Sequence, residues 1–342
     1  MVACYRPAMA ANETETRLSQ TGEVGTEWLF AEIEALARAN RSRRDLDRER
    51  RLLQLRHLAG ISLRGGGSSP EHPEPDLTGL PEDQRVPDIR AADVTPGLLR
   101  AGILRDGCLL VRGLVDRVTA LRFADQIERA FEERERNRSE AVEGYYEEFE
   151  PEPPFRAPHR EWIKEGGGLL AADSPQLNFE MMEMFEQASV PELVADYLGE
   201  PAAMSLNKTT LRKAEPSVVG AWHQDGAFMG DVRSINLWLS LSRCGDEAPG
   251  LEIVPRRLDH LVETGGEGTM IANQVSEATA EKAAGEIGTV SPIFEPGDAM
   301  FFDELFLHQT GSDPSMPNPR YAIESWFFAA SAFPGDYAPI AV

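Results

Sequence analysis

The chain has 342 residues, of which 42% are hydrophobic and 27% are charged, and a formal net charge of −23. This length allows one large domain with additions or two modest domains, and the composition is typical of a protein with a hydrophobic core. The negative charge argues against a nucleic-acid partner, because phosphates require a basic surface. The longest apolar run, Trp326 to Phe333, is too short to span a membrane, so no membrane partner is expected.

The first residues and the cysteines indicate the compartment. Residues 1–20 contain no apolar segment of the kind that a signal peptide requires. The three cysteines, Cys4, Cys108 and Cys244, are widely separated and odd in number, which predicts neither a disulfide framework nor a zinc knuckle. We therefore expect a reducing, cytoplasmic environment.

The sequence divides into an extension, a linker and a main domain. We expect residues 1–20 to be disordered, residues 21–63 to form a helical extension, and the Gly-, Ser- and Pro-rich residues 64–90 to form a linker. The main domain is expected over 91–338. The apolar residues that recur at helical spacing in the extension are Trp28, Leu29, Ile33, Leu36 and Ala37.

The main domain begins with a short apolar strand at 107–113 and an amphipathic helix at about 117–136. The next segment, 139–168, is acidic, aromatic and broken by prolines. A long irregular segment inside a compact domain is usually functional or disordered. We interpret 139–168 as a candidate lid over the site, with a surface loop as the alternative.

Beyond residue 191 the sequence becomes rich in short apolar segments separated by Gly, Pro, Asp or Asn, which are typical of strands. Many short strands predict a sandwich or barrel. The fold class expected is therefore α+β with a mainly β core, arranged as a jelly roll with flanking helices. The predicted strands are 203–212, 218–223, 234–242, 251–254, 287–294, 298–303 and 320–329.

Three residues of the main domain can build an open metal site. Residues i and i+2 of an extended strand point to the same face, so His223 and Asp225 could reach one ion together, with His308 as a third ligand. Two imidazoles and one carboxylate leave coordination positions free, which suits non-haem Fe(II) and differs from a closed structural zinc site. A lone His-x-Asp pair also arises by chance, so its neighbours decide its weight.

An arginine and a threonine after His308 could hold an anion beside this site. Arg320 enters the apolar segment 321–329, where its guanidinium would need an anionic partner such as a carboxylate. Thr310 offers a hydroxyl to the same carboxylate. The alternatives are a salt bridge from Arg320 to an Asp or Glu of the chain, and a turn in which Thr310 caps its own backbone.

Taken together and in this order, the motifs resemble the phytanoyl-CoA dioxygenase family of Fe(II)/2-oxoglutarate-dependent oxygenases. The resemblance covers roughly residues 100–330 and implies a double-stranded β-helix, which is a jelly roll. The matching segments are Leu110–Leu114, Trp222–Asp225, Asn236–Leu241, Gly250–Pro255 with His260, and Pro296–Asp298 followed by His308–Thr310 and Arg320.

The resemblance also implies roles for single residues. His223, Asp225 and His308 match the catalytic iron ligands, while Arg320 and Thr310 match the groups that hold the distal carboxylate of 2-oxoglutarate. Two further positions, Trp238 and Thr210, match neighbours of the cosubstrate, with core packing as the alternative for Trp238.

Two positions qualify the resemblance. His260 corresponds to the histidine that ends the family's Pro-x-Ser-His stretch, but the sequence here is Pro-Arg-Arg-Leu-Asp-His, so a structural role for His260 is the first expectation. Halogenating relatives carry Gly or Ala in place of the metal carboxylate. Asp225 therefore favours hydroxylation or another oxidation over halogenation.

The activity implied by the resemblance is oxidation, most often hydroxylation, of a C–H bond of a small metabolite. Fe(II) is the cofactor, 2-oxoglutarate and O2 are consumed, and succinate and CO2 are released. The substrate class includes specialised-metabolite intermediates and acyl conjugates, and the sequence indicates no oligomeric state. Two other interpretations stay open: a non-catalytic jelly-roll binder of small molecules, and a cupin-like metalloenzyme that does not use 2-oxoglutarate.

Overall fold

The computed structural model describes residues 22–64, 71–82, 84–136, 144–156, 158–230 and 232–342. The predicted disorder of 1–20 lies outside these residues, as do parts of the predicted linker and of the candidate lid. Across the described helices, none combines the length and the apolar character needed to cross a bilayer.

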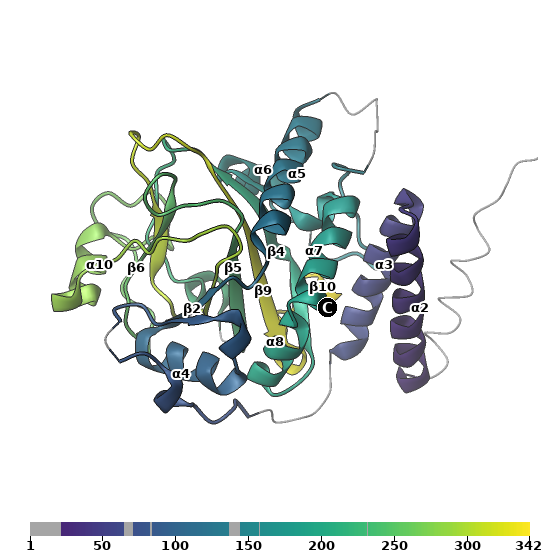
Figure 1. The fold of residues 1–342 in the computed structure, drawn as a ribbon, viewed down its shortest axis with the longest axis horizontal. Coiled ribbons are helices and arrows are strands. Elements are labelled where there is room, and N and C mark those ends of the chain that lie inside the picture. Colours follow the sequence, from purple (N-terminus) through teal and green to yellow (C-terminus); the bar gives the residue numbers. More distant parts are fainter. Residues whose placement is uncertain (1–21, 65–70, 83, 137–143, 157, 231) are drawn as a thin grey trace, which may run out of the picture.

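The N-terminal extension forms two helices that lie side by side at one end of the molecule (Figure 1). They are α2 (Gly22–Ser42) and α3 (Leu46–Leu63), and the Asp45 carboxylate caps α3 by accepting a hydrogen bond from the Arg48 amide. The apolar faces of the two helices pack on each other. α3 also packs on strand β10 (Pro339–Ala341), where Nδ1 of the buried His57 lies 2.9 Å from the carbonyl oxygen of Pro339.

The main domain contains a large sheet and a small one. The large sheet has the order β1-β2-β7-β5-β9-β4-β10, with β3 paired to β4; the pairing is antiparallel except between β1 and β2. The small sheet consists of β6 and β8. The strand bounds are β1 (Asp88–Arg90), β2 (Cys108–Arg112), β3 (Gly168–Leu170), β4 (Ala202–Ala214), β5 (Ser234–Ser240), β6 (Gly250–Ile253), β7 (Ala299–Phe302), β8 (His308–Gly311) and β9 (Arg320–Ala329).

Helices flank the large sheet, as Figure 1 shows for α4, α5, α7 and α8. The two sheets and flanking helices confirm the predicted α+β class with a mainly β, jelly-roll core. The α-helices are α4 (Pro96–Asp106), α5 (Arg117–Glu135), α6 (Arg160–Glu165), α7 (Pro175–Gln187), α8 (Val190–Leu198), α9 (Gly226–Met229) and α10 (Glu277–Ala284). The short 3-10 helices are η1 (Leu77–Gly79), η2 (Ala91–Asp93), η3 (Ala171–Asp173), η4 (Gly285–Ile287) and η5 (Ala330–Ala332).

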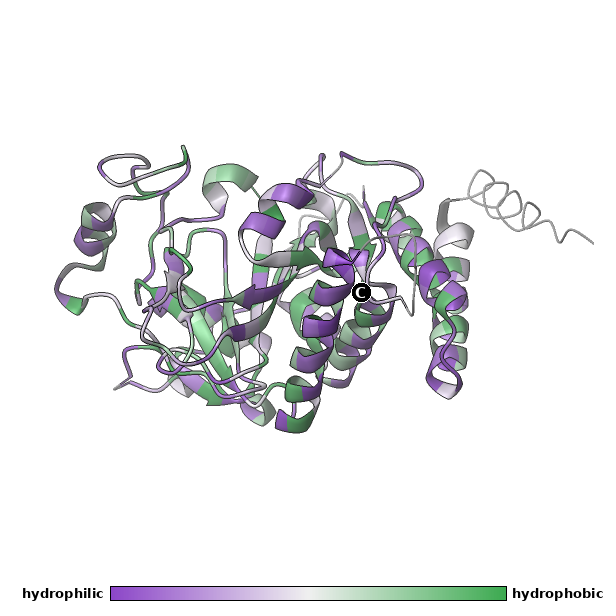
Figure 2. Ribbon diagram, turned by 90° about the horizontal axis from the view of Figure 1, so that it is seen from above, coloured by the Kyte–Doolittle hydropathy of each residue, from purple (hydrophilic) through white to green (hydrophobic). Residues whose placement is uncertain are grey.

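Alternation along the strands separates two cores. In β5, Leu237 and Leu239 pack with the helices, whereas Trp238 points to the opposite face. In β7, Phe301 joins the helical core and Phe302 joins Trp238. This second, inner cluster also contains the apolar residues of β6 and therefore lies between the two sheets. In Figure 2 the strands are coloured mostly as hydrophobic. On the helices, hydrophobic and hydrophilic residues alternate.

The predicted strands differ from the structure at two segments. Residues 218–223 and 287–294 form only isolated bridges, which involve His223, Val290 and Phe294. The short strands β1, β3, β8 and β10 were not predicted. β1 occupies the last residues of the segment predicted as a linker, where it pairs with β2. These strands hold three or four residues each, too few for an alternating pattern to stand out.

The contact between α3 and β10 makes a prediction about Gly60. A Cβ atom at Gly60 would lie 2.8 Å from the backbone carbon of Pro339, whereas one at Gly335 would have no atom within 4 Å. Overpacking costs about 1–3 kcal/mol, and the higher helix propensity of alanine returns about 1 kcal/mol. We expect Gly60→Ala to lower the free energy of unfolding in urea, with Gly335→Ala as the matched control. A gain in stability of about 1 kcal/mol in Gly60→Ala, the effect of helix propensity alone, would show that the two backbones are not in close contact.

Candidate metal centre

Two backbone hydrogen bonds join the segments that carry the predicted histidine ligands. The His223 amide donates to the carbonyl oxygen of His308 at 3.0 Å, and the His308 amide donates back to that of His223 at 3.1 Å. The two imidazole rings lie on the same side of this bridge, with their centroids 4.4 Å apart. Residues that are 85 positions apart in the chain are thereby brought into contact.

The backbone also orients each imidazole. Nδ1 of His223 lies 2.7 Å from the carbonyl oxygen of Ala221, and Nδ1 of His308 lies 3.0 Å from that of Phe306. A carbonyl oxygen can only accept, so each Nδ1 carries the proton and each Nε2 presents its lone pair, the arrangement usual for metal-bound histidines. Burial, followed by the neighbouring His223, lowers the pKa of His308 to about 4, which keeps this ring neutral at physiological pH.

Asp225 completes the group, but not as predicted. The expectation that His223 and Asp225 share an extended strand is wrong: Asp225 has φ −63° and ψ −28° and starts the short helix α9. Its Oδ2 lies 3.9 Å from Nε2 of His308, is buried and has no hydrogen-bond partner. One candidate ligand atom from each of the three residues lies within 4.8 Å of the others. The helical turn at Asp225 therefore brings its carboxylate close to the two histidines, as the predicted strand was expected to do.

Arg320 is buried on the inner face of β9. Its side chain is 4% exposed, and its Nε has no hydrogen-bond partner. Among the described residues no carboxylate forms an ion pair with it, so the alternative of an internal salt bridge is not observed. Burial lowers the pKa of Arg320 to about 10, which leaves the guanidinium charged at neutral pH. The guanidinium carbon lies 5.3 Å from the ring centroid of Trp238.

The two predicted threonines lie on the strands around this interior. Thr310 follows His308 by two positions on β8 and pairs with Leu251 of the inner cluster, so its side chain faces the same side as His308. Thr210 on β4 lies opposite Glu324 on β9, and its hydroxyl is 3.5 Å from that carboxylate. Both positions agree with the predicted pocket, and their roles toward a cosubstrate stay predictions.

Sequence reasoning missed three charged residues of the same interior. The Lys208 ammonium lies 4.0 Å from Oδ1 of Asp225 and 3.8 Å from the ring centroid of Phe228. Glu324 accepts hydrogen bonds from Arg212 at 2.8 and 3.0 Å. Burial acts to raise the pKa of Glu324, but the charge and hydrogen bonds of Arg212 outweigh it and lower the pKa to about 2. Simple alternation does not identify Lys208, because the register of β4 shifts between Met204 and Thr209.

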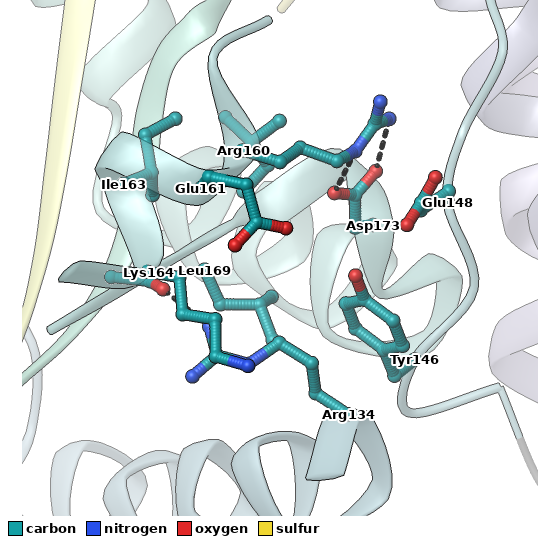
Figure 3. A pocket seen from close by; sticks show the side chains of 11 residues that line it. Arg134, Tyr146, Glu148, Arg160, Glu161, Ile163, Lys164, Leu169 and Asp173 are labelled. Carbon is teal, nitrogen blue, oxygen red and sulfur yellow. Dashed lines mark hydrogen bonds and ion pairs between the residues drawn. The ribbon is translucent and has the colours of Figure 1, made fainter. Parts of the chain in front are cut away.

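The candidate lid is held by a buried ion pair. Arg160, at the start of α6, binds both carboxylate oxygens of Asp173 at 2.8 Å (Figure 3). The Asp173 carboxylate also accepts from the amide of Phe149 at 2.9 Å. The small pocket in Figure 3 lies in this region, and none of the residues lining it is a candidate metal ligand. Arg160 therefore has an acidic partner within the protein. Whether 139–168 acts as a lid stays a prediction.

His260 does not have the buried structural role expected for its ring. Its side chain is exposed, while its backbone carbonyl oxygen accepts a hydrogen bond from Nε2 of Gln224 at 3.1 Å. The Gln224 amide also donates to the Leu305 carbonyl at 2.6 Å. Gln224, which lies between the candidate ligands His223 and Asp225, is thus held by the backbone of His260 and not by its imidazole.

The chain matches the profile of one protein family, described as phytanoyl-CoA dioxygenase (PhyH), over residues 103–316. This match covers more than half of the chain and includes all three candidate metal ligands. The chain belongs to the phytanoyl-CoA dioxygenase family. It is therefore a member of a family of non-haem iron oxygenases that depend on Fe(II) and 2-oxoglutarate, as the motifs predicted.

Solved structures show more distant likenesses. The epimerase SnoN, in complex with Fe3+, alpha ketoglutarate and nogalamycin RO, is 20% identical with a TM-score of 0.45, covering 68% of this chain and 82% of that chain. EctD from S. alaskensis with bound Fe is 14% identical with a TM-score of 0.47, covering 69% and 78%. AviO1 from Streptomyces viridochromogenes Tue57 is 19% identical with a TM-score of 0.44, covering 69% and 96%. No curated protein matches the chain in sequence. Likenesses this low carry no information on the reaction.

The residues of this chain fit the iron of a phytanoyl-CoA dioxygenase family member. Two neutral imidazole nitrogens and one carboxylate oxygen form the ligand set of open non-haem Fe(II) sites. Oδ2 of Asp225 is a buried acceptor without a partner, which a cation would satisfy. His223, Asp225 and His308 are accordingly the residues that would hold the metal.

The geometry makes a prediction about metal affinity. Anaerobic titration of the wild-type protein with Fe(II), followed by elemental analysis, should show one tightly bound ion per chain. We expect His308→Ala to weaken binding by more than about 100-fold, because loss of a direct ligand exceeds the effect of an outer hydrogen bond. His260→Ala is the matched control and should bind as the wild type does. Equal iron content in the two variants would contradict the assignment.

Proposed function

We propose that the protein is an Fe(II)/2-oxoglutarate-dependent dioxygenase that hydroxylates a C–H bond of a small metabolite. In this proposal His223, Asp225 and His308 hold the iron, and the reaction releases succinate and CO2. The family match supports the oxygenase class. The proposed outcome, hydroxylation, rests on Asp225, because this carboxylate occupies the position that halogenating relatives leave to halide.

The observation that carries the use of 2-oxoglutarate is the buried charge of Arg320. A guanidinium inside a protein costs several kcal/mol unless an anion compensates it. The planar fork of an arginine matches a carboxylate in a two-point interaction. In the proposal Arg320 binds the distal carboxylate of 2-oxoglutarate, Thr310 donates its hydroxyl to the same group, and Trp238 and Thr210 flank the cosubstrate.

The surrounding residues orient the reactants and exclude water. Aromatic rings pack around His308, with the centroid of Phe302 at 4.9 Å and that of Phe306 at 5.9 Å. On the other side, Phe228 stacks with His223 at 6.4 Å and with the ammonium of Lys208. An aromatic lining of this kind excludes water, which protects a reactive centre from reaction with solvent, and it holds a substrate carbon in place. When bound, the iron would supply the redox chemistry by which O2 oxidises 2-oxoglutarate and the substrate.

The first test of this function concerns Arg320. Removing one partner of a buried charge pair typically costs about 3–5 kcal/mol, which corresponds to roughly two to three and a half orders of magnitude in a dissociation constant. We expect Arg320→Gln to weaken anaerobic 2-oxoglutarate binding by this factor while Fe(II) still binds. The control Arg90→Gln removes an arginine whose side chain is 80% exposed and should leave the affinity unchanged.

The same titration separates the alternative functions. Iron binding with no affinity for 2-oxoglutarate in the wild type would favour a cupin-like metalloenzyme. Binding of neither iron nor 2-oxoglutarate would favour a non-catalytic jelly-roll binder. An identical 2-oxoglutarate affinity in Arg320→Gln and Arg90→Gln would show that Arg320 does not hold the cosubstrate.

A second test identifies the reaction. The protein with Fe(II), ascorbate, 2-oxoglutarate and O2 is incubated with a metabolite library that includes acyl conjugates, and products are analysed by mass spectrometry. We expect one compound to gain the mass of one oxygen atom, with formation of succinate. Asp225→Ala should abolish both products. A substrate that loses two hydrogens or closes a ring instead would show an oxidation other than hydroxylation.

A further inference from the structure

A second cavity lies apart from the metal centre, at the end of the large sheet where β5 begins and β7 ends. Its volume is about 260 Å³. None of the residues lining it is a candidate metal ligand or a predicted cosubstrate residue. The charged residues that line it are Arg100 of α4, Arg233 before β5, Arg257 after β6, and Asp303 and Glu304 after β7.

Two of the three arginines form no ion pair with an acidic residue that the structure describes. Arg257 binds the carboxylates of Asp303 and Asp259. By contrast, Arg100 donates a hydrogen bond to the hydroxyl of Tyr197 at 3.3 Å and to no carboxylate among the described residues. Arg233 donates from Nε to the carbonyl oxygen of Leu198 at 2.8 Å, while its Nη2 is buried without a hydrogen-bond partner. Within the described part of the chain, neither Arg100 nor Arg233 forms an ion pair.

The remaining titratable groups offset only part of this charge. Burial, followed by the neighbouring Asp303, raises the pKa of Glu304 to about 7, and its carboxylate accepts from the Ser234 hydroxyl at 2.7 Å. Burial lowers the pKa of His72 to about 4, so this ring is neutral. The charge of Glu200 acts on Arg233, and that of Asp303 acts on Arg100, in both cases without an ion pair between these described residues. The cavity therefore carries an excess of positive charge in a chain whose net charge is −23.

We propose that this cavity binds a small doubly charged anion of the phosphate class. Arg100 and Arg233 supply two guanidinium groups from separate elements, a geometry suited to the several oxygens of a phosphate. The hydroxyl of Tyr197 accepts from Arg100 and can donate its own proton to the anion. The volume is below the range of about 300–1,000 Å³ typical of drug-sized ligands, so the ligand is small.

The loop that lines this cavity also supports the metal centre. The carbonyl oxygen of Glu304 accepts from the amide of Gly226 at 2.9 Å, and that of Leu305 accepts from the side chain of Gln224 at 2.6 Å. Gly226 and Gln224 are the two neighbours of Asp225. Glu304, which lines the cavity, is thus joined by a hydrogen bond to the backbone next to a candidate metal ligand. Binding of an anion in this cavity does not depend on the proposed function.

The experiment is isothermal titration calorimetry of the full chain with inorganic phosphate, at constant ionic strength balanced with chloride. We expect saturable one-to-one binding by the wild type. Arg233→Gln and Arg100→Gln should each weaken it by about tenfold or more, because each variant loses a charge-assisted hydrogen bond to the anion. Glu304→Gln removes a nearby negative charge and should tighten binding. Arg90→Gln is the matched control and should bind as the wild type does.

Several results would overturn the inference. They are the absence of saturable phosphate binding by the wild type, and equal affinities in Arg233→Gln and Arg90→Gln. Saturation by succinate but not by phosphate would assign the cavity to carboxylates instead. Thermal melting identifies a variant that fails to fold, in which case Arg233→Lys replaces it: it keeps the charge, loses the planar fork, and should bind phosphate with intermediate affinity. Retained phosphate binding in Arg320→Gln distinguishes this cavity from the predicted 2-oxoglutarate pocket.

Discussion

The candidate metal centre depends on one short contact, the pair of backbone hydrogen bonds between His223 and His308. These bonds join the segment that leads into α9 to strand β8 of the small sheet, and they fix the spacing of the rings. The carbonyl oxygens two residues before each histidine then select the tautomer. Side-chain chemistry at the site is therefore a consequence of backbone geometry, and Asp225 is added by the turn into α9.

Much of this could be predicted from sequence because the relevant signals are local or belong to the family. The strands around Trp238 and Arg320 are apolar, alternate in a recognisable way and were predicted nearly to their ends. The ligand set followed from the order of the motifs. The position of Arg320 in an apolar segment already implied a buried charge, and the structure places it inside with no acidic partner among the described residues.

Other features could not be predicted because they depend on tertiary contacts. The short strand β8, which begins at His308, has no hydrophobic pattern of its own and exists because β6 and the His223 bridge pair with it. Asp225 was assigned to a strand because a local i, i+2 rule cannot see the helical turn at α9. Glu324 and Lys208 were missed because the sequence carries many acidic and basic residues, and only the fold shows which of them point inward.

The charges buried between the two sheets have an energetic consequence for the stability of the whole molecule. Charges enclosed without partners raise the free energy of the folded state, and a ligand that pairs with them lowers it again. Folding and occupancy are then linked by mass action, so that the midpoint of thermal unfolding rises with the logarithm of ligand concentration. Under the proposed function, the pairing of Arg320 with 2-oxoglutarate would make the stability of the native state depend on the concentration of this metabolite.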